Sequence, residues 1–182
     1  MCKSLFFYGL MAMLFFCSIN GKAQVYATQR GIAIFNAKMP INSYSGESND
    51  LQGTINFETN EVAFKVLVKS IKTGNNKRDR HMYKLLQVEN FPEVVFKGKL
   101  IGDFDLNKRA RQELKVNGNF TLAGTTRNVS IPIELNPIEE GIELNASWFL
   151  LISNYNLERP SIAFIKVDDK HDLNIDALLK KK

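Results

Sequence analysis

The residues best suited to chemistry in this 182-residue chain are few, and most of them stand in one run, Arg78-Asp79-Arg80-His81. A histidine close to a carboxylate is typical of general acid–base catalysis, so one interpretation makes His81 a base that Asp79 orients. The second histidine, His171, stands in a polar, acidic stretch. The sequence has no nucleophile elbow, no metal-site spacing of histidine and cysteine, and no glycine-rich phosphate loop. An enzyme is therefore the weaker interpretation, and no catalytic or metal-binding residue is assigned.

The same run has two further interpretations. In a structural role, Asp79 caps a helix start or pairs with Arg78, and His81 donates to a strand carbonyl. In a binding role, Arg78 and His81 stand at the mouth of a pocket and meet the polar head of a ligand. The residue types alone leave both roles open, so the elements that carry the run have to be considered.

Most of the chain after residue 23 alternates between apolar and polar residues with a period of two. This pattern is typical of antiparallel sheet with one face toward water. The alternation is clearest over residues 113–122. The expected strands lie within residues 24–38, 51–58, 62–68, 92–101, 113–122, 129–135, 142–150 and 161–167, and the last resumes at 173–178 after a polar break.

One segment departs from this alternation. Residues 75–87 place Met82, Leu85 and Leu86 at helical spacing, which predicts a short amphipathic helix that ends before Phe91-Pro92. The predicted fold is all-β, a closed antiparallel barrel or a sandwich of about eight strands, with the helix between strands three and four. Closure removes exposed strand edges, and eight strands leave room for side chains or one small ligand.

The apolar phase of the strands is rich in phenylalanine, since the chain has 13 Phe against 5 Tyr and 1 Trp. Small residues at Gly53, Gly118 and Ala146 predict an interior with space left in it. The candidates for the wall of a ligand cavity are Phe64, Val66, Phe96, Phe120 and Trp148. The alternative is that the same residues fill the barrel, whose outer face would then bind another protein.

The first 23 residues predict an export signal. A cationic start, an apolar run over residues 5–16 that is too short to span a bilayer, and small residues near Ala23 form the expected layout. We expect cleavage between Ala23 and Gln24, which leaves residues 24–182 as a single periplasmic or secreted domain.

The charge and cysteine content of that domain argue against several classes of function. Two of the 24 Lys and Arg residues precede residue 24, which leaves 22 against 19 Asp and Glu, too near neutrality for a nucleic-acid partner. Both cysteines, Cys2 and Cys17, also precede residue 24, so we expect no disulfide and no cysteine metal site. We expect no cofactor and no membrane-spanning segment in the mature chain. The oligomeric state stays open, a dimer included.

Three blocks of this sequence resemble blocks that occur together in one known family. They are Val68-Lys-Ser-Ile-Lys-Thr73 with Arg78-Asp79, His81-Met82 and Phe91-Pro92; Gly118-Asn-Phe-Thr-Leu-x-Gly124-x-Thr126-Arg127-x-Val129; and Asn154-Tyr155-Asn156 with Pro160. The chain thereby resembles the YceI-like lipid/polyisoprenoid-binding family. In this chain Phe120 stands where that family usually has Leu, and Asn154 where it has Asp.

The resemblance implies an exported, lipocalin-like barrel whose apolar cavity holds an isoprenoid or other lipid chain without catalysis. Together with the apolar phase of the strands, it indicates a set of ligand-binding residues. That set is Phe64, Val66, Arg78, His81, Met82, Phe96, Phe120 and Trp148.

Overall fold

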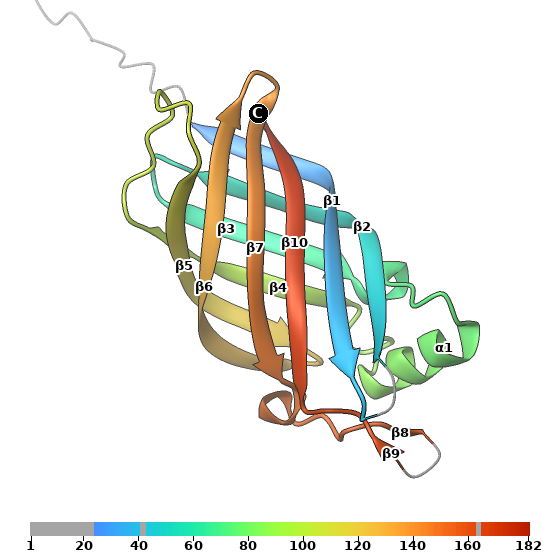
Figure 1. The fold of residues 1–182 in the computed structure, drawn as a ribbon. Helices are drawn as coiled ribbons and strands as arrows, with labels where there is room; N and C mark the ends of the chain where they lie inside the picture. Colours follow the sequence, from blue (N-terminus) through green and yellow to red (C-terminus); the bar gives the residue numbers. More distant parts are fainter. Residues whose placement is uncertain (1–23, 41–42, 163–164) are drawn as a thin grey trace, which may run out of the picture.

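The computed structural model describes residues 24–40, 43–162 and 165–182, so the expected export signal lies outside the described residues. Eight antiparallel strands close into one barrel (Figure 1). In the order in which they neighbour one another, the strands are β1 (Val25–Lys38), β10 (Lys170–Lys181), β7 (Gly141–Leu151), β6 (Thr125–Ile138), β5 (Gln112–Leu122), β4 (Glu93–Ile101), β3 (Glu61–Leu67) and β2 (Ser43–Asn56). The prediction of a closed, lipocalin-like all-β barrel is confirmed.

The prediction of a wall strand at residues 161–167 was wrong. The described residues of this segment form β8 (Ser161–Ile162) and β9 (Ile165–Lys166), which pair with each other and lie outside the barrel sheet. The eighth wall strand is instead β10, which is long enough to pair with β1 on one side and with β7 on the other. A strand of two residues cannot close a barrel, because closure needs a backbone ladder along both neighbouring strands.

Strands β2 and β6 are longer than their hydrophobic alternation predicts. The polar residues 43–50 belong to β2 because the full length of β1 offers them backbone partners, from Lys38 opposite Ser43 onward. Similarly β6 continues through Pro137 to Ile138 before it turns into β7. Hydrogen bonding to a neighbour therefore extends both strands beyond the residues that alternate between apolar and polar.

The end of the barrel that carries the C-terminus is filled. Phe57 stacks on Phe104 with ring centroids 4.6 Å apart, and Tyr26 meets Phe57 edge-on at 5.6 Å. Below these rings the side chains of Leu135 and Leu179 are fully buried. This end is therefore a solid core, covered by the connection between β4 and β5.

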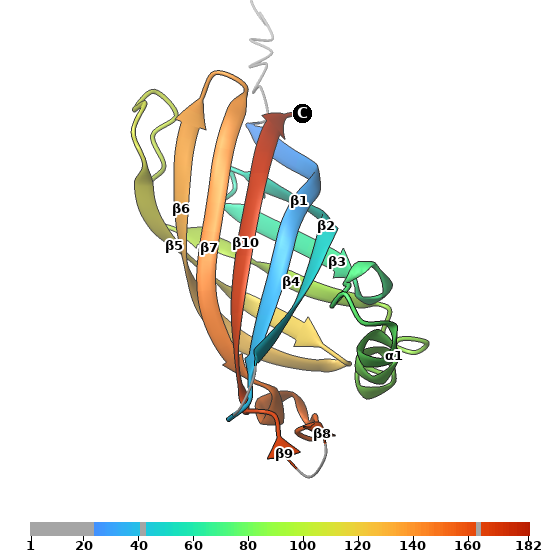
Figure 2. The same ribbon diagram turned by 45° about the vertical axis from the view of Figure 1, so that its right-hand side comes forward.

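The helix α1 (Asn76–Leu85) lies between β3 and β4 in the chain, as predicted, and at the opposite end of the barrel from the C-terminus (Figure 2). Its N-cap is Asn75, whose side chain accepts hydrogen bonds from the amides of Lys77 (3.0 Å) and Arg78 (3.1 Å). The capping role that the sequence suggested for Asp79 thus belongs to Asn75. Tyr83 anchors the middle of the helix, with its hydroxyl 2.9 Å from the Ile71 carbonyl.

Asp79 instead fixes the loop before the helix. Its buried carboxylate accepts from the amide (2.9 Å) and the hydroxyl (2.6 Å) of Thr73. Burial opposes ionisation of this carboxyl, but the hydrogen bonds from Thr73, with Lys72 and Arg78 nearby, hold its pKa below its usual value. The buried charge is therefore satisfied, and α1 is held at one position relative to β3.

We expect Asp79→Ala to lower the free energy of unfolding by about 1–3 kcal/mol, because two donors of Thr73 would lose their acceptor in a buried place. Urea denaturation measures this as a lower midpoint with an unchanged slope. The control is Glu89→Ala, which removes an exposed ion pair with Lys69 (2.8 Å) and should cost about 1 kcal/mol or less. Equal losses in the two variants would contradict a specific role for Asp79.

Candidate functional site

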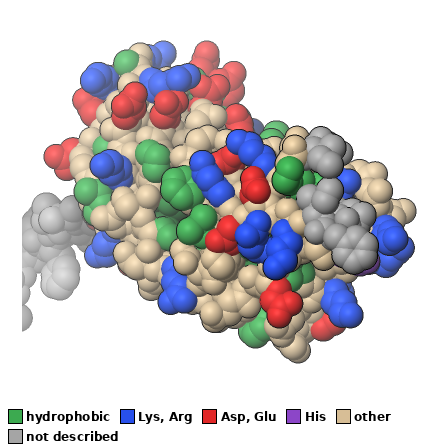
Figure 3. Space-filling view, turned by 60° about the horizontal axis from the view of Figure 1, so that its bottom comes forward, with side chains coloured by type: hydrophobic (Ala, Val, Ile, Leu, Met, Phe, Trp, Pro, Cys, Tyr) green, Lys and Arg blue, Asp and Glu red, His purple; other side chains and the backbone are tan. Residues whose placement is uncertain are grey.

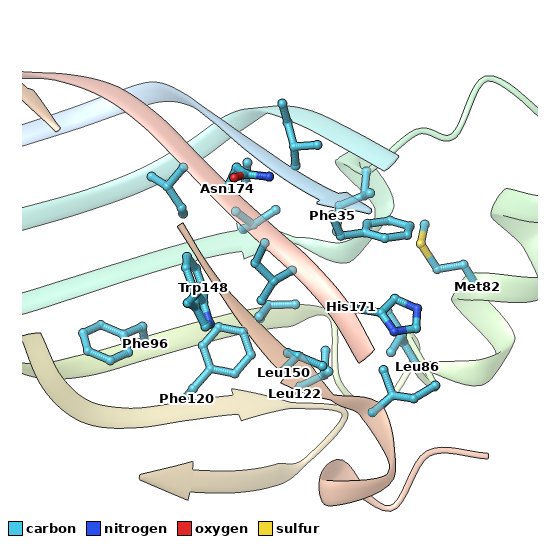
Figure 4. A pocket seen from close by; sticks show the side chains of 18 of the residues that line it. Phe35, Met82, Leu86, Phe96, Phe120, Leu122, Trp148, Leu150, His171 and Asn174 are labelled. Carbon is cyan, nitrogen blue, oxygen red and sulfur yellow. The ribbon is translucent and has the colours of Figure 1, made fainter. Parts of the chain in front are cut away.

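A cavity of about 700 Å³ occupies the half of the barrel nearer to α1 (Figure 4). This volume is within the range of about 300–1,000 Å³ typical of small-molecule sites. The alternative of a barrel filled throughout is therefore wrong for this half of the interior. Side chains of all eight wall strands line the space, among them Ile55, Phe64, Val66, Phe96, Phe120, Ile133, Trp148 and Leu173.

Two glycines on β2 make room for aromatic rings on neighbouring strands. Gly53 lies opposite Phe64 in the ladder, and a Cβ atom at Gly53 would meet that ring at 2.0 Å. Gly46 lies opposite Phe35 in the same way, with the ring 2.2 Å from such an atom. Each ring occupies the place that a side chain on β2 would take. The rings therefore lie over the backbone of β2, which keeps the lumen open.

The middle of the cavity has an aromatic wall. Phe120 meets Trp148 edge-on with ring centroids 6.1 Å apart, and it meets Tyr155 in the same way at 5.8 Å. Phe96 stands opposite both Phe64 and Phe120 in the ladders of its two neighbouring strands. Edge-to-face pairs of this kind hold the rings in fixed positions. The wall is consequently preformed and apolar.

Polar side chains line the cavity mainly at its α1 end. There the Arg78 guanidinium lies over the Tyr44 ring, 4.6 Å from the centroid, and its Nη1 donates to the Thr73 carbonyl at 3.4 Å. Burial raises the pKa of the Tyr44 hydroxyl, although Arg78 opposes the shift. Arg78 is half-buried and thus places a positive charge at the mouth of an apolar space.

His171 is a cavity residue that the sequence analysis missed. It is buried at the start of β10, tilted against the Phe35 ring with centroids 6.2 Å apart, and its Nδ1 lies 3.2 Å from the Asp169 carbonyl. An Nδ1–H donated there leaves Nε2 as an acceptor. The sequence could have indicated this position through the alternation of β10. His171 precedes Leu173 and Ile175 by two and four residues, and both of those side chains face inward.

The other predicted residues of α1 also line the cavity. Met82 is packed against the core, and His81 is exposed at the mouth. No hydrogen bond joins His81 to another of the described residues, so the suggested bond to a strand carbonyl is absent there. Asp79 is engaged by Thr73, and residues two apart on a helix do not face each other. The acid–base pair of His81 and Asp79 is therefore not formed.

All eight predicted binding residues thus line one cavity, five from strands and three from α1. Among the described residues, no group of three or more His, Cys, Asp or Glu could hold a metal ion. Within the same residues, no helix has the length and apolar character to span a bilayer.

A family model described as the YceI-like domain matches residues 24–179. The sequence is 31% identical to Protein YceI of Salmonella newport (strain SL254) over 144 residues, which cover 73% of this chain and 72% of that relative. Protein YceI of Salmonella paratyphi B is 30% identical over the same lengths.

Solved structures are similar in fold at lower identity. A polyisoprenoid-binding domain from Saccharophagus degradans, implicated in plant cell wall breakdown, superposes with a TM-score of 0.72 at 12% identity, covering 88% of this chain and 100% of that one. BcnA of Burkholderia cenocepacia gives a TM-score of 0.65 at 11% identity, covering 83% and 96%. The barrel fold is thus shared with proteins whose sequences are only 11–12% identical to this one.

The buried His171 predicts a loss of stability in mild acid. Burial lowers the pKa of its ring below 6.5, although the Asp169 carbonyl and nearby carboxylates oppose the shift. The folded state therefore holds His171 neutral, while the unfolded chain binds a proton as the pH falls through 6.5. The contribution of His171 to the free energy of unfolding is therefore fully present above pH 6.5. Below that pH it decreases by up to about 1.4 kcal/mol per pH unit.

We expect His171→Gln to flatten the dependence of unfolding free energy on pH between 6.5 and about 5, above the range in which carboxylates titrate. The measurement is urea denaturation across that interval. His81→Gln, which removes the exposed histidine of α1, is the control. A profile flattened equally by the control would refute the assignment to His171.

Proposed function

The chain belongs to the YceI-like domain family, and on that premise we propose that it binds the apolar chain of an isoprenoid or other lipid inside its barrel. The observation that carries this proposal is the 700 Å³ cavity, apolar along its length and polar mainly at one end. The likeness to a polyisoprenoid-binding domain supports the same ligand class.

The wall chemistry favours a ligand with an apolar chain. Phe96, Phe120 and Trp148 offer ring faces and edges, and a hydroxyl or charge placed among them would lose its hydrogen bonds to water. A polar ligand head finds most of its partners at the α1 end, near Arg78 and His171. The ligand therefore enters with its chain toward the filled end and its head at the mouth.

A carrier without catalysis is the role we assign. The only acid–base pair that the sequence suggested is not formed, because Asp79 holds Thr73 rather than His81. Residues 1–23 have the pattern of an export signal, so we place the carrier in the periplasm or outside the cell. The eight cavity residues named from the sequence are the proposed binding residues, with His171 added.

Native mass spectrometry of the purified protein tests this proposal. We expect a bound lipid that is released unchanged by extraction, and the same spectrum reports the oligomeric state and whether the exported chain begins at Gln24. After delipidation, a long-chain isoprenoid should raise the melting temperature, because a ligand of the folded state stabilises it. No bound lipid and no shift with several lipids would favour a protein-binding barrel, while a converted lipid would indicate an enzyme.

Gly53→Ala tests whether the ligand uses the cavity interior. The new Cβ meets the Phe64 ring and displaces it toward the lumen. Losing one or two methylene contacts, at about 0.8 kcal/mol each, should weaken binding of a long-chain isoprenoid by about four- to fifteenfold. Isothermal titration calorimetry measures this, with Thr54→Val on the same strand as the control. Unchanged affinity in Gly53→Ala would place the ligand elsewhere.

Arg78→Ala tests the mouth. If its guanidinium meets an anionic head, the variant should weaken binding of a pyrophosphorylated isoprenoid by roughly ten- to a hundredfold more than that of the neutral alcohol, as a charge-assisted hydrogen bond is worth roughly 1.5–3 kcal/mol. Arg80→Ala on the same helix is the control, since Arg80 does not line the cavity. An unchanged ratio of the two affinities would leave Arg78 with a structural role through Tyr44 and Thr73.

A further inference from the structure

The exposed face of α1 carries a row of basic residues. Lys77, Arg80, His81 and Lys84 follow the spacing i, i+3, i+4 and i+7, so they share one side of the helix. All four are exposed, and none of the ion pairs among the described residues involves them. The one acidic residue of the helix, Asp79, is buried on the other side. This basic row is therefore not neutralised by the protein.

Several other lysines at the same end of the barrel lie close to carboxylates. Lys69 pairs with Glu89 at 2.8 Å, and Lys38 and Lys170 lie 3.5 and 3.4 Å from the carboxylate of Asp172. Figure 3, in which this end comes forward, shows Lys and Arg side chains gathered there with Asp and Glu between them. The basic row of α1 differs from these lysines in having no carboxylate partner among the described residues.

The exposed large apolar side chains gather at this end as well. Four such side chains stand out among the described residues: Leu67 (45% exposed), Phe91 (36%), Ile101 (48%) and Phe149 (57%). Leu67 ends β3, Phe91 lies between α1 and β4, and Phe149 lies two residues before the end of β7. Only Ile101 lies at the opposite end. Water-exposed apolar groups are thus concentrated around the rim that carries the basic row.

We propose that this end of the barrel docks on the surface of an anionic phospholipid bilayer, with the basic row of α1 against the headgroups. A row of basic residues with apolar side chains beside it is the composition that peripheral proteins use at such surfaces. The charge attracts the protein over a distance of about 8 Å at physiological ionic strength, and the apolar rim contacts the headgroup region.

The docked orientation places the cavity mouth on the bilayer. His81 and Lys84 belong both to the basic row and to the lining of the cavity, so the mouth opens beside the docked face. A lipid chain would then pass between membrane and lumen without crossing water. This consequence rests on the proposed function, whereas docking itself needs no cavity ligand.

The test is cosedimentation with vesicles made of equal parts phosphatidylglycerol and phosphatidylcholine. The protein is the chain from Gln24, which contains all eight strands of the closed barrel and the whole matched family domain. The variant Lys77→Gln/Arg80→Gln changes neither cavity-lining nor helix-capping side chains, and Gln has a similar helix propensity. The matched control is Lys108→Gln/Arg109→Gln, which removes the same charge from exposed positions at the filled end.

We expect the chain from Gln24 to bind these vesicles, and to lose that binding in 1 M salt or on vesicles of phosphatidylcholine alone. The α1 variant should bind about thirtyfold more weakly, or about fivefold for each charge, as about 1 kcal/mol per basic residue predicts. The control should lose less than a few-fold. Equal losses of vesicle affinity in the two variants, or no vesicle binding by the unaltered domain, would overturn the proposal. An acidic protein partner would then be the alternative.

Discussion

Pairing of β1 with β10 closes the sheet, and the remaining structure depends on that closure. The ladder sets Ala33 opposite Ile175 and Phe35 opposite Leu173, so the inward phase of the first strand meets the inward phase of the last. Once eight strands are closed, the width of the interior is fixed by strand number and stagger. Side chains then either fill that width or leave it open. In this chain they fill the half that carries the C-terminus and leave the half nearer to α1 open.

The difference between the two halves comes from which residues face each other. At the filled end the side chains of Leu135, Ile142 and Leu179 are fully buried. At the open end Gly46 and Gly53 let the Phe35 and Phe64 rings lie over β2, so large side chains take little of the lumen. A cavity here costs no unsatisfied polar group, because none of the described buried side-chain polar atoms lacks a hydrogen-bond partner.

The position of α1 follows from the same closure. Strands β3 and β4 are neighbours, so the long segment between them must stay at the end of the barrel where β3 stops. Asn75 starts the helix, and Asp79 ties its first turn to Thr73. The basic residues of one short segment are thereby brought to the mouth of an apolar cavity. Charge and apolar surface meet there because the chain connectivity leaves the helix nowhere else to lie.

The amino-acid pattern alone predicts the strands with clear alternation, such as β5 and β7, and the short helix. It also predicts the inward phase that holds Phe96, Phe120 and Trp148. Each of these follows from a period of two or of 3.6 residues, which is local information. Three features required the folded barrel: which end is hollow, the burial of His171 at the mouth, and the closure of the sheet by β10. These features depend on which residues from distant strands face each other, and the register that sets this arises only when the ladder closes.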